Sequence, residues 1–292
     1  MIPPMPPPRG PEQDGGTASL HPRYEDITQD GRLVLTALMP GLGEAIWRSL
    51  ISKLPATKVL RSQGIVPILS RMIAVGEDRP VSVDVPIRYT GSFRYARERG
   101  GERIFANMWL EAHAPIASTF GPLPGPDAPL ALVGRVFAEH VVTRPFAPPG
   151  ERKVTRLDVP GLPPIPEDEH LFETAEQLVE SAGGALESAG EFQFGMMHTD
   201  SNQHVNSLVY PRVFEEHAVR RFMLDAAAPT KQALLARALD IRWRRPFFAG
   251  DRAKIAMRFA DPAAAAGWKL SAVGAFQGDA AKPSTTLKMC FR

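Results

Sequence analysis

Cysteine is almost absent from this chain: its 292 residues include one, Cys290. A lone thiol cannot form an intramolecular disulfide or a cysteine-based zinc cage. Its neighbours Met289 and Phe291 predict a strand near the C-terminus, which argues against a nucleophilic role for Cys290. Long apolar runs are also lacking, because no uninterrupted stretch approaches the ~20 residues that a membrane-spanning helix needs. We therefore expect no membrane insertion.

The chain also lacks a large excess of either charge sign, since 34 Lys and Arg against 32 Asp and Glu leave a formal net charge of +2. This balance argues against a nucleic-acid binder driven by bulk charge, although a local basic patch stays open. The N-terminus lacks a basic segment followed by an apolar one, so no secretory signal is predicted. Hydrophobic residues make up 44% and charged residues 23%, as in ordinary globular proteins. A cytoplasmic enzyme without a nucleic-acid partner is the expectation.

Proline is abundant, and its distribution divides the chain. Residues 1–18 are rich in Pro and Gly, so they are expected to form a disordered or extended tail that joins no helix or sheet. Pro-rich composition returns over residues 145–168 and predicts a semi-rigid linker. A short helix is predicted over 167–181, ended by Gly183-Gly184. Two folded halves, 19–144 and 186–292, then flank a linker over 145–185.

Both halves show the same faint order of elements: strand, helix, then several strands. In the first half, a helix over 42–54 follows from apolar residues at helical spacing, and Pro55 is expected to end it. Alternation such as Val81, Val83 and Val85 predicts half-buried antiparallel strands. The elements expected in the first half are a strand–turn–strand over 24–39, the helix, and strands over 66–74, 80–95, 103–113 and 130–144. Those expected in the second half are a strand over 190–198, helices over 207–224 and 230–239, and strands over 240–248, 252–259, 267–277 and 284–291.

The chemistry gathers in one short polar loop between a strand-like and a helix-like segment. It holds an acid, two amides and an imidazole: Asp200, Asn202, Asn206 and His204. Asn206 and Ser207 are residue types that cap helices, and backbone N–H groups just after a cap lack intrahelical partners. Such a helix start favours developing negative charge, which suits a reaction that passes through an oxyanion.

Each of these side chains also has a plain structural alternative. Asp200 could activate water or attack a carbonyl, or it could only form an Asx turn. His204 could deprotonate water or polarise a carbonyl, or only bond within the loop. The amide of Asn202 could hold water or a carbonyl oxygen, or serve a turn, and Asn206 is most simply a helix cap.

The pattern Asp200-x-Asn202-x-His204-Val205-Asn206, with Tyr210 and a Glu-containing helix after it, resembles the motif of hotdog-fold thioesterases. It is most similar to the acyl-ACP thioesterases, whose loop is much like Asn-Gln-His-Val-Asn-Asn; Ser207 replaces the last Asn here. The likeness covers residues 191–222 and continues more weakly through 240–251. It implies an α+β fold of two tandem hotdog domains, each an antiparallel sheet wrapped around a long central helix. It also implies hydrolysis of an acyl thioester, carried by an acyl carrier protein or coenzyme A, without a cofactor, and it leaves a homodimer open.

For individual residues, the resemblance implies an essential acid at Asp200. A further acid on the helix would be Glu215 or, as we expect, Glu216, and Tyr210 would pack near the substrate. The family's acid on the following strand falls near Arg242, which is basic, so either Asp240 substitutes for it as a catalytic residue or Asp200 and His204 act without it. Asn206, Tyr210 and Arg242 are then the expected substrate contacts. The corresponding junction of the first half, residues 38–43, carries no acid, histidine or amide, so one active site per chain is expected.

Three alternatives stay open. His198, Asp200 and His204 could be metal ligands, but the usual zinc-site spacings are missing, so no metal is expected. A hotdog-fold hydratase or dehydratase, or an acyl-binding protein without catalysis, would use the same fold. A local basic region could hold phosphates of coenzyme A or an acidic carrier, or simply be a solvated face; its members are Arg242, Arg244, Arg245, Arg252, Lys254 and Arg258.

Overall fold

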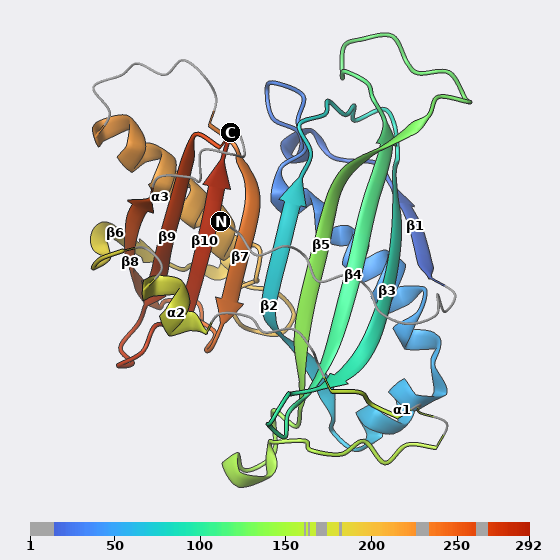
Figure 1. The fold of residues 1–292 in the computed structure, drawn as a ribbon, viewed down its shortest axis with the longest axis vertical. Coiled ribbons are helices and arrows are strands. Elements are labelled where there is room, and N and C mark those ends of the chain that lie inside the picture. Colours follow the sequence, from blue (N-terminus) through green and yellow to red (C-terminus); the bar gives the residue numbers. More distant parts are fainter. Residues whose placement is uncertain are drawn as a thin grey trace. The chain divides into compact units, whose positions relative to one another are not determined.

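Within each half of the chain the strands pair antiparallel with one another in the computed structural model (Figure 1). The structure describes residues 15–160, 162, 164–167, 174–180, 183–225, 234–260 and 268–292. The N-terminal unit consists of the described residues of Met5–Leu33 and Ala37–Leu171. The C-terminal unit consists of Val34–Thr36 and the described residues of Phe172–Arg292.

The sheet of the N-terminal unit has the order β1-β3-β4-β5-β2. Its strands are β1 (Gly16–Leu20), β2 (Val66–Gly76), β3 (Ile87–Arg97), β4 (Ile104–Pro115) and β5 (Leu130–Thr143). Strand β1 corrects the predicted tail, because residues 16–18 pair with β3. The prolines of the N-terminal segment end at Pro11, so every residue of β1 has an N–H that can pair with the edge of β3. The rest of the predicted tail, residues 1–14, lies outside the described residues.

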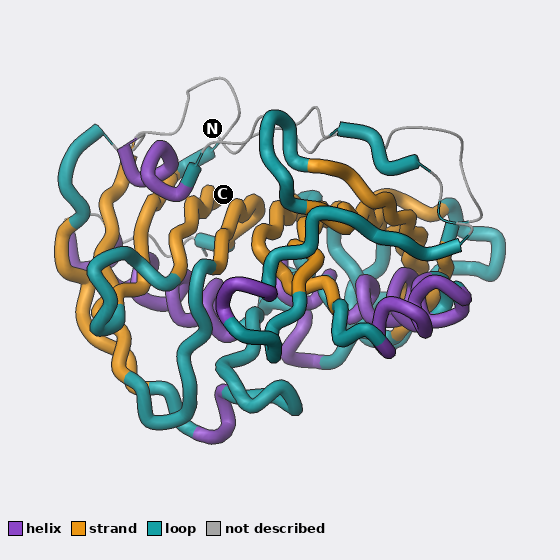
Figure 2. Tube along the Cα trace, turned by 90° about the horizontal axis from the view of Figure 1, so that it is seen from below, coloured by secondary structure: helices purple, strands orange, loops and turns teal. Residues whose placement is uncertain are grey.

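Helical segments cover one face of this sheet (Figure 2). The single helix predicted over 42–54 is wrong in detail: a π-helix spans Leu42–Arg48, a 3-10 turn spans Ile51–Lys53, and α1 spans Pro55–Ser62. The hydroxyl of Ser49 donates to the carbonyl of Ala45, while the Ser49 N–H donates to Glu44. Pro55 begins the next helix, where its missing N–H costs nothing.

Two paired glycines let the π-helix approach the sheet closely. Gly16 and Gly91 lie opposite each other on β1 and β3. A Cβ atom on Gly16 would lie 1.6 Å from the carbonyl oxygen of Ala45, and one on Gly91 would lie 2.5 Å from the Ile46 side chain. Any larger residue at either position would push the helix off the sheet.

The strand–turn–strand predicted over 24–39 does not form, and the strand predicted over 80–95 forms only in its second part. Residues 24–39 contain 3-10 turns at Tyr24–Asp26 and Leu35–Leu38 with one isolated bridge, Ile27 to Leu33, between them. Residues 80–86 are irregular because Pro86 lacks an N–H and the hydroxyl of Ser82 accepts from the Asp84 N–H, so β3 starts only at Ile87.

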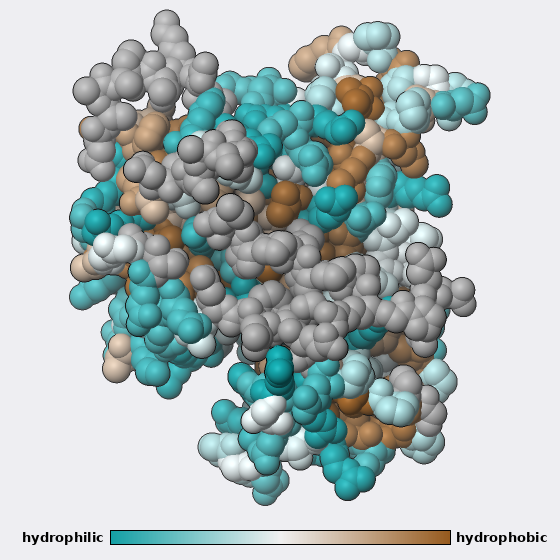
Figure 3. Space-filling view, viewed as in Figure 1, coloured by the Kyte–Doolittle hydropathy of each residue, from teal (hydrophilic) through white to brown (hydrophobic). Residues whose placement is uncertain are grey.

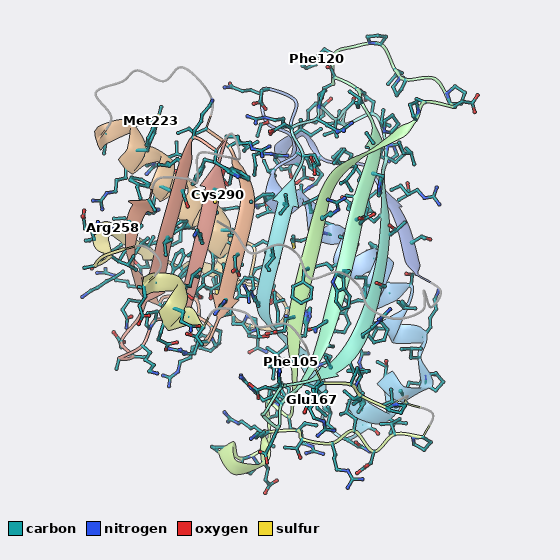
Figure 4. The ribbon with its side chains drawn as sticks, in the orientation of Figure 1. Phe105, Phe120, Glu167, Met223, Arg258 and Cys290 are labelled. Atoms are coloured by element: carbon teal, nitrogen blue, oxygen red, sulfur yellow. The ribbon has the colours of Figure 1, made fainter. Side chains whose placement is uncertain are left out.

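The β4–β5 loop of the N-terminal unit presents apolar side chains to solvent. Ile116, Phe120 and Leu123 are exposed, Phe120 almost completely at 97%. Figure 3 shows apolar side chains over this loop, and Figure 4 labels Phe120 at its tip. The loop is therefore one place where this unit exposes a group of large apolar side chains.

The sheet of the C-terminal unit has the order β7-β10-β9-β8-β6. Its strands are β6 (Glu187–Gln193), β7 (Ala236–Trp243), β8 (Arg252–Ala260), β9 (Leu270–Gln277) and β10 (Thr285–Phe291). The helix predicted over 230–239 is wrong where it is described, since Ala236–Leu239 pair with β10 as part of β7. Pairing with β10 buries this segment and overrides its helix-forming alanine and leucine residues.

Helices cover both faces of this second sheet. The predicted long helix is confirmed as α3 (Val209–Asp225). Its Phe214 ring lies over Gly274 of β9, where a Cβ atom would come within 2.3 Å of the ring. The short helix α2 (Ala175–Glu180) lies on the opposite face, where Leu178 packs on Val273. Residues 168–173 of the longer helix predicted there lie outside the described residues.

Cys290 lies within β10, where Figure 4 labels it. It is buried, and its Sγ lies 3.6 Å from the hydroxyl of Ser271. The predicted C-terminal strand is thus confirmed. Among the helices that the structure describes, none combines the length and apolar character needed to cross a membrane.

Candidate active site

The predicted polar loop forms a tight hairpin in front of α3. Thr199 and Val205 make an isolated antiparallel bridge. The Asp200 N–H donates to the His204 carbonyl at 3.2 Å, and the Gln203 N–H donates to the Asp200 carbonyl at 2.9 Å. Gln203 has φ of 64°, the left-handed conformation that closes a three-residue hairpin loop. The hairpin thereby sets Asp200 and His204 opposite each other at its closed end.

Backbone bonds to two other segments fix this hairpin in the C-terminal unit. The Val205 N–H donates to the carbonyl of Phe247 at 2.7 Å, beyond the end of β7. The Asn206 N–H donates to the carbonyl of His198 at 2.9 Å. His198 ends a 3-10 turn, Met196–His198, so the predicted strand over 190–198 stops early and β6 does not lead directly into the loop.

Both carboxylate oxygens of Asp200 accept a hydrogen bond. Oδ1 accepts from the Asn202 N–H at 2.8 Å, and Oδ2 accepts from the side-chain amide of Asn206 at 3.0 Å. The Asx turn considered from sequence is therefore present. It does not exclude chemistry, because each oxygen keeps a second lone pair and the side chain is only partly buried.

Among the residues that the structure describes, the His204 ring makes a hydrogen-bond contact through only one of its nitrogens. Its Nδ1 lies 3.3 Å from the Val205 carbonyl oxygen, which can only accept, so a neutral ring carries its proton on Nδ1. The lone pair is then on Nε2. The Asn202 side chain is exposed and makes no hydrogen bond to the residues that the structure describes. The Nε2 atom of His204 and the side-chain amide of Asn202 are therefore the groups of this loop that can bind a further molecule.

The start of α3 offers fewer free N–H groups than its sequence suggests. The Leu208 N–H donates to Oδ1 of Asn206 at 2.8 Å, and the Val209 N–H donates to the Asn206 carbonyl at 3.0 Å. Pro211 has no N–H. Asn206 is therefore the helix cap, and the N–H groups of Leu208 and Val209 are already in use.

Tyr210 belongs to the core of the C-terminal unit. Its side chain is 1% exposed, and its ring lies 5.5 Å from the Phe276 ring and 5.8 Å from the Phe194 ring, centroid to centroid. Its hydroxyl accepts the Phe247 N–H at 3.2 Å, and burial raises its pKa to about 12. Phe247 also accepts the Val205 N–H, so Tyr210 supports the hairpin through Phe247. Its buried ring is not exposed for contact with a substrate.

The two acids of α3 point in different directions. Glu216, the one expected in catalysis, is exposed and pairs with Arg220 on the same helix. Glu215 is partly buried and accepts the Ala236 N–H at 2.9 Å, at the start of β7. The hairpin is held beyond the other end of β7, at Phe247. Among the contacts of the described residues, none joins either acid to the hairpin.

Burial raises the pKa of Glu215, with the Ala236 N–H and Arg237 acting in the opposite sense. A raised pKa means that this group stabilises the fold below its unfolded pKa, and that this contribution is lost as pH rises through the folded pKa. Glu215→Gln keeps an oxygen for the Ala236 N–H. We therefore expect its melting temperature to exceed that of the wild type at pH 8 but not at pH 4, in thermal scans at both pH values.

Glu216→Gln is the matched control, because its side chain is exposed and should leave both melting temperatures nearly unchanged. A Glu215→Gln protein that is less stable than the wild type at pH 8 would contradict the expectation. It would show that the charge of Glu215 stabilises the unit.

Asp240 does not lie on the face of the sheet that carries α3. Gly274, which lies under Phe214 of α3, aligns with Leu287 and Ile241 across β9, β10 and β7. Neighbouring residues of a strand face opposite sides, so Asp240 lies on the other face, in line with Lys288. It is fully buried there. The structure thus does not bring Asp240 to the hairpin.

Arg242 shares this second face with Asp240, because the two are two residues apart on β7. The basic region predicted as a landing site for phosphates or an acidic carrier is partly neutralised, because Arg244 pairs with Glu176 of α2 at 2.9 Å. Hydrogen bonds from Arg244 are the main cause that lowers the pKa of Glu176 to about 2. Arg242 is therefore not a substrate contact on the hairpin's side of the sheet.

His198 serves the frame of the loop. Its Nδ1 accepts the Gly195 N–H at 2.8 Å, and its ring packs on Phe192 and Phe194 at 5.1 and 6.2 Å between centroids. Among the residues that the structure describes, no three His, Cys, Asp or Glu side chains gather in a way that could hold a metal ion.

Comparison with known proteins reveals the likeness in the fold and not in the sequence. No protein-family model and no curated protein matches the chain. A solved structure from Lactobacillus plantarum, described as an oleoyl thioesterase, superimposes with a TM-score of 0.63 at 14% identity, covering 96% of each chain. The 12:0-ACP thioesterase of Umbellularia californica gives 0.62 at 12% identity, covering 97% of this chain and 99% of that one. An acyl-ACP thioesterase of Bacteroides thetaiotaomicron gives 0.56 at 13% identity, covering 95% and 98%. The chain therefore has the fold of these proteins, which confirms at that level the resemblance suggested by the motif.

Proposed function

We propose that this protein hydrolyses acyl thioesters, with one active site per chain at the Asp200–His204 hairpin. The proposal is carried by a single observation: the hairpin sets a doubly hydrogen-bonded carboxylate opposite an imidazole with a free Nε2, beside an unused amide. The shared fold with three thioesterases supports it. We further propose that the chain is a tandem of two hotdog domains, residues 19–144 and 186–292, joined by the linker over 145–185, and that the first has no site of its own.

In this proposal the thioester carbonyl oxygen accepts a hydrogen bond from the amide of Asn202. A water molecule lies between Asp200 and His204 Nε2, where Nε2 holds it by accepting a hydrogen bond. Asp200 takes a proton from this water while the water oxygen attacks the carbonyl carbon. The oxyanion collapses, the C–S bond breaks, and the departing thiolate takes up the proton that Asp200 had accepted from the water. Because a thiolate is a good leaving group, the site needs to supply only a positioned water and oxyanion stabilisation.

The carrier is proposed to be an acyl carrier protein. Two of the three structural neighbours are described as acyl-ACP thioesterases. Coenzyme A is the other carrier to test. Purified protein should be assayed with saturated acyl groups of different chain lengths on both carriers, with free thiol as the readout. Turnover on carrier-protein substrates above that on coenzyme A is the expected result.

The same assay separates the other functions of this fold. Hydration of an enoyl-CoA without release of thiol would identify a hydratase. Co-purified acyl ligand without turnover of any thioester would identify an acyl-binding protein. Either result would refute the proposal.

Asp240→Asn tests whether an acid on β7 takes part. Because Asp240 lies on the sheet face opposite α3 and is fully buried, we expect kcat within about threefold of the wild type. Exchanging a carboxyl oxygen for an NH₂ group at this buried position replaces a hydrogen-bond acceptor by a donor, which should lower stability by about 1–3 kcal/mol. Turnover and melting temperature should be measured on the same preparation. A loss of turnover beyond tenfold at an unchanged melting temperature would instead place Asp240 in the site.

A further inference from the structure

Asn206 joins the acid of the hairpin to the start of α3. Its side-chain Nδ2 donates to Oδ2 of Asp200 at 3.0 Å, and its Oδ1 accepts from the Leu208 N–H at 2.8 Å. Its backbone donates to His198 at 2.9 Å and accepts from Val209 at 3.0 Å. All four bonds are to the protein itself. Both polar atoms of the Asn206 side chain are therefore already engaged within the protein.

This pair of side-chain bonds requires a primary amide. An aspartate could accept from Leu208 but could not donate to a carboxylate, and a serine is too short to span the two partners. A helix cap alone would be served as well by Asp or Ser as by Asn. The residue type is thus explained by the contact with Asp200 and not by the cap.

We propose that Asn206 is a positioning residue that fixes the carboxylate of Asp200 for reaction. With Oδ1 held by the Asn202 N–H and Oδ2 held by Asn206, the carboxylate plane has one orientation. The lone pairs that remain are aimed in a set direction, where a water can be held. The helix start anchors this arrangement, because the same amide is bonded to the first turn of α3. The inference rests on the proposed thioesterase function and assigns Asn206 a role through Asp200, not contact with the substrate.

Asn206→Asp separates the two duties of this residue. Aspartate keeps the oxygen for Leu208 and is a good cap, so the melting temperature should fall only through the loss of the bond to Asp200. It also replaces the donor to Asp200 by a second carboxylate at about 3.0 Å. Two like charges at this distance cannot both ionise freely, so one of them takes up a proton. We expect kcat to fall about tenfold to a hundredfold near pH 7, KM to stay unchanged, and the acid limb of the pH–rate profile to move to higher pH.

Two further variants complete the test. Asn206→Ala removes both the cap and the bond to Asp200, so it should lose activity and also have a lower melting temperature than the Asn206→Asp protein. Gln193→Glu adds the same charge at an exposed position of β6 and should leave the rate and its pH dependence unchanged.

An Asn206→Asp protein with the wild-type rate and pH profile would overturn the positioning role and leave Asn206 as a cap. A raised KM at unchanged kcat would overturn it in favour of a substrate contact. These outcomes differ from failure of the proposed function, which would show as a wild-type protein without thioesterase activity. Carboxyl-carbon NMR of the unliganded protein tests the contact even then: Asp200 should titrate at higher pH in Asn206→Asp, and an unchanged titration would refute the contact.

Discussion

Asp200→Asn is expected to lower thioester hydrolysis by about 10²- to 10⁴-fold, the range that a general acid–base group contributes. Asparagine has nearly the shape of aspartate but cannot take a proton from water. It keeps an oxygen for the Asn202 N–H, while its NH₂ group would face the NH₂ group of Asn206. The loss of that one bond should destabilise the protein by about 1 kcal/mol. kcat/KM and the melting temperature should be measured on the same sample.

A double variant provides the matched control for Asp200→Asn. Asp200→Asn combined with Asn206→Asp restores a carboxylate–amide hydrogen bond with its direction reversed, and the helix keeps an acidic cap. We expect the melting temperature to recover and the activity to stay low, because the acid is then at the wrong position. If activity recovered together with stability, the role of Asp200 would be structural and the mechanism wrong. Near-normal turnover in the single variant would lead to the same conclusion.

His204→Ala is expected to have the second largest effect, a loss of about 10²- to 10³-fold in kcat. The free Nε2 would no longer hold the attacking water next to Asp200. Stability should change little, because the partly buried ring makes one weak contact, at 3.3 Å, with the adjacent Val205 carbonyl. Turnover should be compared with and without added imidazole.

Added imidazole should restore part of the activity of His204→Ala, because a small base can enter the space that the missing ring leaves. It should not restore Asp200→Asn, in which the imidazole ring is still present. His204→Ala with wild-type turnover would remove His204 from the mechanism and leave it as a residue of the hairpin turn.

The sequence determines the local structure where a strong pattern and tertiary packing agree. Apolar residues at helical spacing gave α3, and alternating or continuous apolar runs gave β2, β4, β5, β8 and β10, each within a few residues of its observed bounds. The failures lie where pattern and packing conflict. Ala236–Leu239 look helical but are taken into β7 by pairing with β10, and Gly16–Leu20 look like a tail but pair with β3. Local propensity amounts to a few tenths of a kcal/mol per residue, so a row of backbone pairs and burial overrides it.

The same division holds for the candidate site. The sequence by itself determined that an acid, an imidazole and two amides share one short loop, because residues so close along the chain cannot be separated in space. Tertiary structure decided which other residues could join them. Asp240 and Arg242 lie on the face away from α3, because the register of β7 on β10 sets that face, and a shift of one residue would turn every side chain over. Glu215 is bonded to Ala236 at the start of β7, and Asn206 uses its amide on both Asp200 and α3. No spacing in the sequence contains these contacts, since they depend on how distant segments meet in three dimensions.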